Sequence, residues 1–219
     1  MSHDEDKRIA AEAAVAEVAD GMLVGLGTGS TAAFAIRALT GRPITCVATS
    51  EASGVLARSC GLLVVDFARV ARVDLTIDGA DEIDTACRAI KGAGGAMLRE
   101  KIVAAASARM VVVADGTKRV ASLGAAAVPV EVLPFAAHFV GAALHDLFEH
   151  VELREGLTDN GNVILDGRDA RGRDWPALAE AIAAIPGALG HGLFLEEVDA
   201  AYIADHGVVT RLERGGATS

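Results

Sequence analysis

The amino-acid sequence predicts an α/β fold in which a Rossmann-like parallel-sheet domain is joined to a smaller α+β, ferredoxin-like domain. In the first half, short apolar runs alternate with helix-like segments, which favours parallel strands joined by crossover helices. After Gly124 the pattern changes, because prolines bound one strand and two further runs flank a turn. Apolar residues make up 52% of the 219 residues and aromatic residues only 4%, so we expect an aliphatic core.

The large domain is expected to alternate helix and strand from the N-terminus onward. Its strands are short apolar runs, predicted at residues 22–26, 44–48, 62–66, 74–78 and 110–114. Its helices are segments in which alanine alternates with charged or polar residues, predicted at residues 4–19, 30–39, 51–59 and 95–107. The closing segment AYIADHGVVTRL predicts two strands that return to this sheet.

The small domain is expected to cover one face of a sheet with helices. Its elements are a strand, a helix, a hairpin closed by a turn at 158–161, and a second helix, predicted at residues 128–134, 135–150, 151–166 and 175–185. This order resembles a split βαβ unit. The predicted domain boundaries follow from it: residues 128–198 form the small domain, and residues 1–127 plus 199–219 form the large one.

Charge and hydropathy exclude several classes of function. Thirty acidic residues against twenty basic ones give a formal charge of −10, which argues against a nucleic-acid or acidic-membrane partner. No run of eighteen apolar residues is free of charges or helix breakers, so no membrane span is expected. The acidic, alanine-rich N-terminus does not resemble a signal peptide, and we expect a cytoplasmic protein.

Cysteine and histidine patterns do not predict a metal site. Cys46, Cys60 and Cys87 are far apart and form no CxxC motif, so buried reduced thiols are expected. The six histidines form no HxH or HExxH pattern, and none is assigned to metal binding or catalysis.

A glycine-rich turn, GLGTGSTAAFAIRAL at residues 25–39, lies between a predicted strand and a predicted helix. Gly27 and Gly29 let the backbone approach a ligand, while Ser30 or Thr31 could cap the helix, whose free N–H groups favour a phosphate. The spacing matches neither GxxxxGK[ST] nor a complete GxGxxG motif. The turn therefore predicts an anion site, with a tight strand-to-helix turn as the alternative.

TSEAS, at residues 49–53, also follows a predicted strand and could add hydroxyl donors, or it could simply cap a helix. Ligands of open α/β sheets bind at the carboxyl ends of the strands, so the segments after Gly27, Thr49 and Asp78 are expected to converge.

Residues 78–101 carry the candidate chemistry. Asp78 and Asp81 follow a predicted strand and could face one cavity, for proton transfer and hydroxyl binding or, alternatively, for magnesium binding or backbone capping. Glu82 and Asp84 are expected to be solvated.

A lysine and a glutamate complete this segment. Lys91 precedes the run GAGG, whose N–H groups could stabilise an anionic oxygen. Partial burial of Glu100 would raise its pKa and suit it to general-base work, whereas a solvated charged helix face is the alternative. Lys118, after another strand, could add positive charge at the same edge.

Seven motifs together resemble ribose-5-phosphate isomerases of the A type. In order along the chain, they are GLGTGSTA, TSEAS, DGADEID, KGAGGAMLREK, VADGTK, PVEVLPFA and TDNGNVILD. The resemblance implies interconversion of D-ribose 5-phosphate and D-ribulose 5-phosphate through an enediolate, without a metal or an organic cofactor. It also implies a small-molecule sugar phosphate as substrate and a homodimeric assembly.

The resemblance assigns roles position by position. Glu100 matches the general base, and Asp78, Asp81 and Lys91 match the groups that manage the reacting oxygens. The substrate-binding positions implied are Lys7, Thr28, Gly29, Ser30, Thr31, Gly92, Ala93, Gly94 and Lys118. Ala93 stands where many relatives carry glycine, so we expect it to adopt an ordinary negative φ.

Two other functions are compatible with parts of this pattern. A non-catalytic sugar-phosphate sensor would keep the phosphate loop but would not need Lys91 or Glu100. A related acyl or amino-sugar enzyme using a glutamate should show a different context from LREK around that residue.

Overall fold

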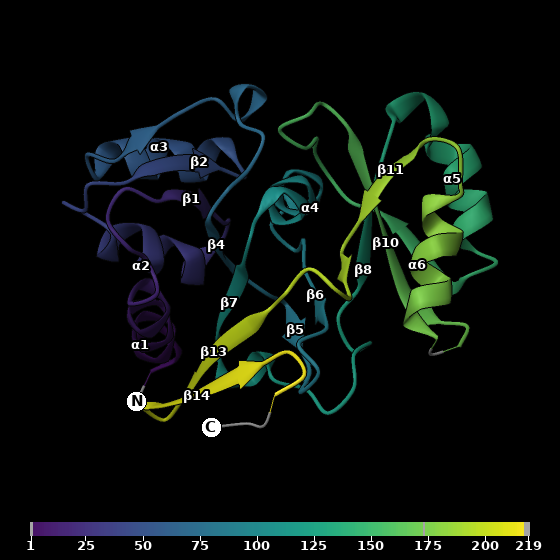
Figure 1. Cartoon of the computed structure of the whole chain (residues 1–219). Helices are drawn as coiled ribbons and strands as arrows, with labels where there is room; N and C mark the ends of the chain where they lie inside the picture. Colours follow the sequence, from purple (N-terminus) through teal and green to yellow (C-terminus); the bar gives the residue numbers. More distant parts are fainter. Residues whose placement is uncertain (1, 173, 217–219) are drawn as a thin grey trace.

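The computed structural model describes residues 2–172 and 174–216 (Figure 1). Within these residues, the large sheet has seven strands, in the spatial order β14 (Val208–Glu213), β13 (Ala200–Asp205), β7 (Met110–Asp115), β4 (Leu75–Gly79), β1 (Leu23–Leu26), β2 (Thr45–Ala48) and β3 (Leu63–Val64). All neighbouring strands are parallel except β13 and β14, which pair antiparallel. The predicted parallel sheet and the return of the closing strands are confirmed.

Helices cover both faces of this sheet. They are α1 (His3–Val15), α2 (Ser30–Ala38), α3 (Glu51–Ser59) and α4 (Met97–Ala106). Every residue of β7 is buried, as is typical of a strand covered on both faces. Alternate β7 side chains point to opposite faces: Val111 and Val113 pack in the cluster of α1 and α2, whereas Val112 packs with Met97 of α4. Helix α4 thus lies between the large sheet and the small domain (Figure 1).

The small domain has a ferredoxin-like sheet in the part of the chain described. Its antiparallel strands lie in the order β11 (Ala188–His191), β8 (Val128–Val132), β10 (Val163–Ala170) and β9 (Phe148–Leu153). Helices α5 (Ala137–Leu144) and α6 (Trp175–Ala183) pack on it. The predicted order of strand, helix, hairpin and helix is confirmed.

The predicted helix at 135–150 is wrong at both ends. A short 3-10 turn occupies Pro134–Ala136, and β9 begins at Phe148. Phe148 is fully buried and pairs across the hairpin with Ala170, and its ring leaves no room for a side chain at Gly167. Packing against a partner strand that is distant in sequence therefore overrides the local helical pattern.

A third, three-stranded sheet was not predicted. It pairs β5 (Glu82–Ile83), β6 (Ala89–Ile90) and β12 (Leu193–Phe194) in the described residues. Such two-residue strands carry no periodicity that a sequence pattern could reveal.

The expectation that Glu82 and Asp84 are solvated is wrong, because both side chains are buried. Glu82 accepts hydrogen bonds from the N–H groups of Gly124 and Ala126, at 2.7 and 2.5 Å. Asp84 accepts from two backbone N–H groups and from Nε of Arg88. Both carboxylates stabilise loops by satisfying buried donors.

Three smaller expectations have mixed outcomes. Cys46 and Cys87 are buried free thiols, as expected, whereas Cys60 is only partly buried. Burial raises the pKa of Cys46 to about 11. Ala93 is not among the described residues with positive φ, as expected. None of the helices in the described part of the chain is long and apolar enough to cross a bilayer.

Candidate active site

A cavity of about 360 Å³ opens at the carboxyl ends of β1, β4 and β7. The predicted anion-binding residues on its walls are Lys7, Thr28, Gly29, Ser30, Thr31 and Lys118. The predicted reacting-end residues on its walls are Asp81, Lys91, Gly92, Ala93, Gly94 and Glu100. Asp78 is fully buried directly behind them. The structure thus brings all predicted site residues to one place.

A buried charge cluster forms the floor of the cavity. Nζ of Lys91 lies 2.9 Å from Oδ2 of Asp78 and 3.1 Å from Oε2 of Glu100. It also donates a short hydrogen bond to the carbonyl of Gly79. All three charged side chains are at most 5% exposed. Oδ2 of Asp78 and Oε2 of Glu100 form ion pairs with this ammonium. Neither oxygen has another hydrogen-bond partner among the described residues.

The pKa values in this cluster follow from its burial and charge. Burial raises the pKa of Glu100 to about 8, and the Asp78 carboxylate adds to the rise while Lys91 opposes it. Burial would lower the pKa of Lys91, but the carboxylates of Asp78 and Glu100 outweigh it and hold that pKa above its ordinary value. Lys91 is therefore a fixed cation, and Glu100 can gain or lose a proton near neutral pH.

Asp78 connects this cluster to the glycine-rich turn. Its Oδ1 accepts hydrogen bonds from the N–H groups of Thr28 and Gly79, at 3.0 and 2.7 Å. A Cβ atom at Gly27 would lie only 2.0 Å from the same oxygen. Glycine at position 27 is therefore required by the close approach of Asp78 rather than by a phosphate.

The predicted anion cradle is present at the start of α2. Gly29 adopts a φ of 107° and precedes the helix, and no side chain caps it. The first N–H groups of the helix therefore remain available to an anion, which the helix dipole favours. Lys7 and Lys118 stand on the same cavity walls and add positive charge.

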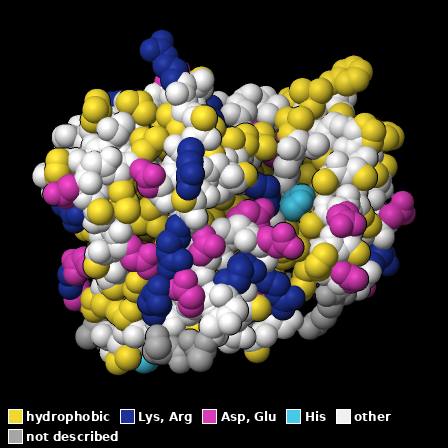
Figure 2. Space-filling view, in the orientation of Figure 1, with side chains coloured by type: hydrophobic (Ala, Val, Ile, Leu, Met, Phe, Trp, Pro, Cys, Tyr) yellow, Lys and Arg dark blue, Asp and Glu magenta, His cyan; other side chains and the backbone are white. Residues whose placement is uncertain are grey.

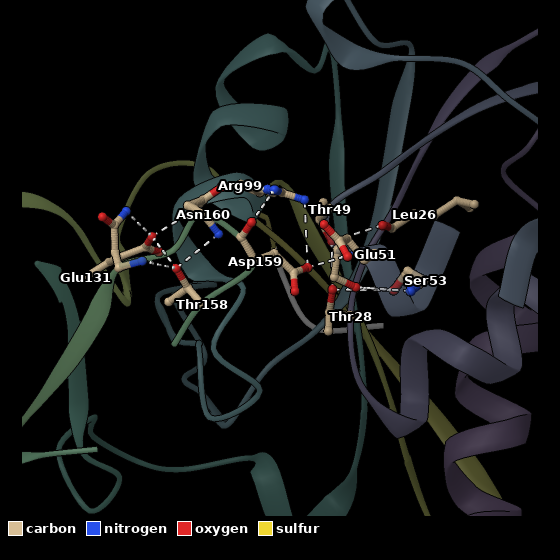
Figure 3. Close-up of polar contacts among 12 residues, drawn as sticks. Leu26, Thr28, Thr49, Glu51, Ser53, Arg99, Glu131, Thr158, Asp159 and Asn160 are labelled. Atoms are coloured by element: carbon tan, nitrogen blue, oxygen red, sulfur yellow. Dashed lines mark hydrogen bonds and ion pairs between the residues drawn. The ribbon is translucent and has the colours of Figure 1, made fainter. Parts of the chain in front are cut away.

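The TSEAS segment supports this cradle from behind instead of contributing donors to the cavity (Figure 3). Oγ1 of Thr49 donates to the carbonyl of Leu26 at 3.0 Å and lies 2.9 Å from Oγ1 of Thr28. Oγ of Ser53 donates to the carbonyl of Gly27 at 2.6 Å. Thr49 and Ser53 are buried and do not line the main cavity. The expectation that their hydroxyls face a ligand is therefore not supported.

The TDNGN turn of the small domain reaches across to the large one (Figure 3). Oε1 of buried Glu131 accepts hydrogen bonds from Thr158 and Asn160, both at 2.9 Å, which fixes the turn to β8. The Asp159 carboxylate accepts the N–H of Glu51 at the start of α3, and Arg99 of α4 donates to Oδ1 of Asn160. A turn that the sequence predicted only as a hairpin closure thus joins the two domains.

Sequence reasoning missed five further residues on the cavity wall: His3, Gly79, Ala80, Asp115 and Thr117. Oδ1 of Asp115 accepts both the N–H and the hydroxyl of Thr117, so it orients that side chain. The segment ADGTK at the end of β7 was the available signal, because its polar residues lie at the carboxyl end of a strand just as those of DGADEID do.

Known proteins of one family match this chain in both sequence and structure. The family model described as ribose 5-phosphate isomerase A (phosphoriboisomerase A) matches residues 45–207. This chain belongs to the ribose 5-phosphate isomerase A family. The match spans the reacting-end segment, the small domain and the returning strand β13.

Individual members of the family cover the chain almost completely. The ribose-5-phosphate isomerase A of Sphingopyxis alaskensis is 51% identical over 97% of this chain and 97% of its own length. A crystal structure of ribose 5 phosphate isomerase A from Neisseria gonorrhoeae has a TM-score of 0.94 and 38% identity, over 97% of this chain and 98% of its own. A D-ribose-5-phosphate isomerase in complex with phospho-erythronic acid has a TM-score of 0.93 and 33% identity, over 98% of this chain and 100% of its own.

Proposed function

We propose that this protein interconverts D-ribose 5-phosphate and D-ribulose 5-phosphate by proton transfer through an enediolate. The observation that carries the proposal is the buried cluster of Lys91, Asp78 and Glu100, which shares one cavity with an uncapped helix N-terminus. One end of the cavity suits a phosphate, and the other supplies a base beside a fixed cation.

The proposed reaction needs a single carboxylate as base. Glu100 removes the proton from C2 of the open-chain aldehyde, and the electron pair moves to O1. Lys91 stabilises the negative charge that develops on the oxygens of the enediolate. A proton then moves from O2 to O1 of the enediolate, and Glu100 returns its proton to C1, so that C2 becomes the carbonyl carbon of the ketose. Asp81, on the cavity wall, holds the hydroxyl groups and assists opening of the sugar ring, while Asp78, buried behind the wall, holds the ammonium of Lys91.

The remaining predicted residues bind the phosphate and orient the sugar. The N–H groups and hydroxyls of Ser30 and Thr31 receive the phosphate, with Lys7 and Lys118 beside it. Lys7 lies 3.2 Å from Asp4 and would exchange this exposed partner for the phosphate. Binding at this remote end holds the reacting carbons against Glu100.

The test is an assay of the purified protein with ribose 5-phosphate, in which formation of ribulose 5-phosphate is followed. Turnover in both directions is expected. Binding of both sugar phosphates without turnover would instead favour the sugar-phosphate sensor. The buried cluster argues against a sensor, because burying three charges is costly and phosphate recognition does not require it.

The pH dependence should report the raised pKa of Glu100. Its base form exists only above that pKa, so kcat/KM should rise about tenfold per pH unit below pH 8 and level off above it. The measurement is kcat/KM between pH 5 and pH 10, with the fold monitored by circular dichroism. A flat profile from about pH 5.5 upward, as the ordinary value of 4.5 would give, would contradict the assignment.

Thr31→Ala should weaken binding of the phosphate end only. Loss of one hydrogen bond to a charged group is expected to raise KM about tenfold and to leave kcat within about twofold. Steady-state kinetics and inhibition by inorganic phosphate measure this effect. The matched control is Thr40→Ala, at the other end of α2, where the hydroxyl only donates to the carbonyl of Arg37. Equal kinetics for the two variants would make the loop purely structural.

Three expectations accompany the proposed function. We propose the domain division at 128–198, which the four-stranded sheet within that range supports, although β12 of the same range pairs with β6 of the large domain. We also propose a cytoplasmic location and a role in the pentose phosphate pathway. We also propose a homodimer. Support comes from apolar side chains gathered over the small domain, at the upper right of Figure 2. Next to α5, Phe135 is 97% exposed.

A further inference from the structure

Arg154 of the small domain reaches the glycine run of the reacting end. It directly follows β9, and Asp166 of β10 holds its guanidinium through two hydrogen bonds, from Nε at 2.8 Å and from Nη2 at 2.5 Å. The remaining nitrogen, Nη1, donates to the carbonyls of Gly92 at 2.8 Å and Ala93 at 3.2 Å. One side chain thus ties the β9–β10 hairpin to the loop that forms one wall of the active-site cavity.

These contacts determine which way the loop's N–H groups point. A trans peptide is planar, so its N–H points away from its own carbonyl. The peptide between Gly92 and Ala93 illustrates this: its carbonyl meets Arg154, and its N–H donates to Oδ2 of Asp81 at 2.9 Å, on the cavity side. The next carbonyl, of Ala93, also faces Arg154, so the N–H of Gly94 is directed to the cavity side as well.

The N–H of Gly94 is available to a ligand. It has no acceptor among the residues that the structure describes, although both neighbouring N–H groups of the loop are used: Ala93 donates to Asp81, and Gly95 donates to the carbonyl of Gly92. Arg154 itself does not line the active-site cavity but lines a second cavity of about 230 Å³, which shares Thr28, Ala93 and Gly94 with the first. Arg154 therefore cannot reach the reacting atoms directly and can act only through the loop.

We propose that Arg154 is a positioning residue that orients the N–H of Gly94 toward the oxygen on which negative charge develops in the enediolate. The inference rests on the isomerase reaction proposed above. Lys91 supplies the positive charge at the floor of the cavity, and Gly94 supplies a neutral donor from its wall. Because Asp166 neutralises the guanidinium, Arg154 acts through geometry rather than through its charge.

Arg154→Lys tests the role of the guanidinium geometry. A lysine keeps the charge but cannot hold Asp166 and both carbonyls at once. We expect kcat to fall about 10- to 100-fold, less than the roughly 10²- to 10³-fold loss on removing an oxyanion donor, because the Gly94 N–H is displaced rather than removed. The KM for ribose 5-phosphate and the inhibition constant of inorganic phosphate should stay within about twofold, because the phosphate cradle is untouched. Phospho-erythronic acid, whose carboxylate places negative charge near the reacting end, should bind about tenfold more weakly.

Two further variants make the test decisive. Asp166→Asn weakens the hold on the Arg154 guanidinium and keeps all of its N–H donors. It should therefore lower kcat less than Arg154→Lys does, again with KM unchanged. If Arg154→Lys does not fold, this variant tests the positioning role on its own. Arg168→Lys changes an exposed arginine on β10 and is the matched control, with wild-type kinetics expected.

The outcomes distinguish this inference from the proposed function. Unchanged kcat in the folded Arg154 or Asp166 variants would overturn the positioning role while leaving the isomerase intact. A parallel loss of kcat, phosphate affinity and thermal midpoint would also overturn it, because that pattern indicates general loosening of the hairpin. Absence of turnover in the wild-type protein would overturn the proposed function itself.

Discussion

Glu100→Gln is expected to lower kcat by about 10²- to 10⁴-fold, the contribution of a positioned general base. The amide has nearly the same shape as the carboxyl group but cannot accept the C2 proton. KM should stay within about twofold, because the phosphate cradle and Lys91 remain in place. Exchange of the C2 hydrogen of ribose 5-phosphate with solvent, followed by NMR, should be lost in parallel with kcat.

The same variant should make stability less dependent on pH. The folded-state pKa of Glu100, about 8, lies above its ordinary value of 4.5, so the fold favours the protonated form. Its contribution to the free energy of unfolding is thus complete below about pH 4.5 and is lost as pH rises through 8. Glutamine is neutral at every pH, so the variant should not show this decrease in the free energy of unfolding as pH rises.

Chemical denaturation at pH 5 and pH 9 measures the difference. Glu149→Gln, on an exposed position of β9, is the matched control and should change neither kcat nor the pH dependence. A Glu100→Gln enzyme with near-normal kcat would refute the base assignment, whatever its stability.

Lys91→Met is expected to have the largest effect on stability. It leaves Asp78 and Glu100, 0% and 5% exposed, without the cation that neutralises them. Breaking a buried ion pair in this way lowers the free energy of unfolding by about 3–5 kcal/mol. Loss of the ammonium should also lower kcat by about 10²- to 10³-fold, because the enediolate loses its main electrostatic partner.

The destabilisation should grow with pH. Without Lys91, nothing opposes the burial that raises the folded-state pKa of Glu100, so stability is retained where this carboxyl group is protonated and is lost as pH rises. Urea unfolding at pH 5 and pH 9 tests this. Lys101→Met is the comparison: it removes an ion pair to Glu197, whose two groups are 21% and 23% exposed, and a hydrogen bond to the carbonyl of Leu193, and a loss of about 1–2 kcal/mol is expected. An equal effect of the two substitutions would contradict the buried-cluster interpretation.

Local patterns sufficed to predict the elements whose signals lie within a few residues. The helix predicted over 51–59 has the observed bounds Glu51–Ser59. Its signals are local: a short apolar strand precedes it, and the Ser50 side chain accepts the N–H of Ser53 as an N-cap. The anion cradle was likewise predicted from glycines and hydroxyls between a strand and a helix.

Most of the errors involve partners that are distant in the chain; Asp84, whose partners are Ala86 and Arg88, is an exception. Phe148 joins β9 because β10 packs against it, and Glu82 is buried because Gly124 and Ala126 need an acceptor. Thr49 and Ser53 bond to the backbone of the neighbouring loop instead of facing the cavity. No pattern within one segment contains this information.

The sequence by itself determined the chemical groups of the site and their order: an anion-binding turn, carboxylates after a strand, a lysine before glycines and a glutamate on the following helix. The tertiary structure alone decided which of these groups act on one another. Folding places Nζ of Lys91 3.1 Å from Oε2 of Glu100, and burial raises the pKa of that carboxyl group. The small-domain residue Arg154 donates a hydrogen bond to the carbonyl of Gly92 and so orients the glycine run. Desolvation and contact between distant segments exist only after the chain has folded, so residue types and spacing could name the groups but not the geometry that makes them a site.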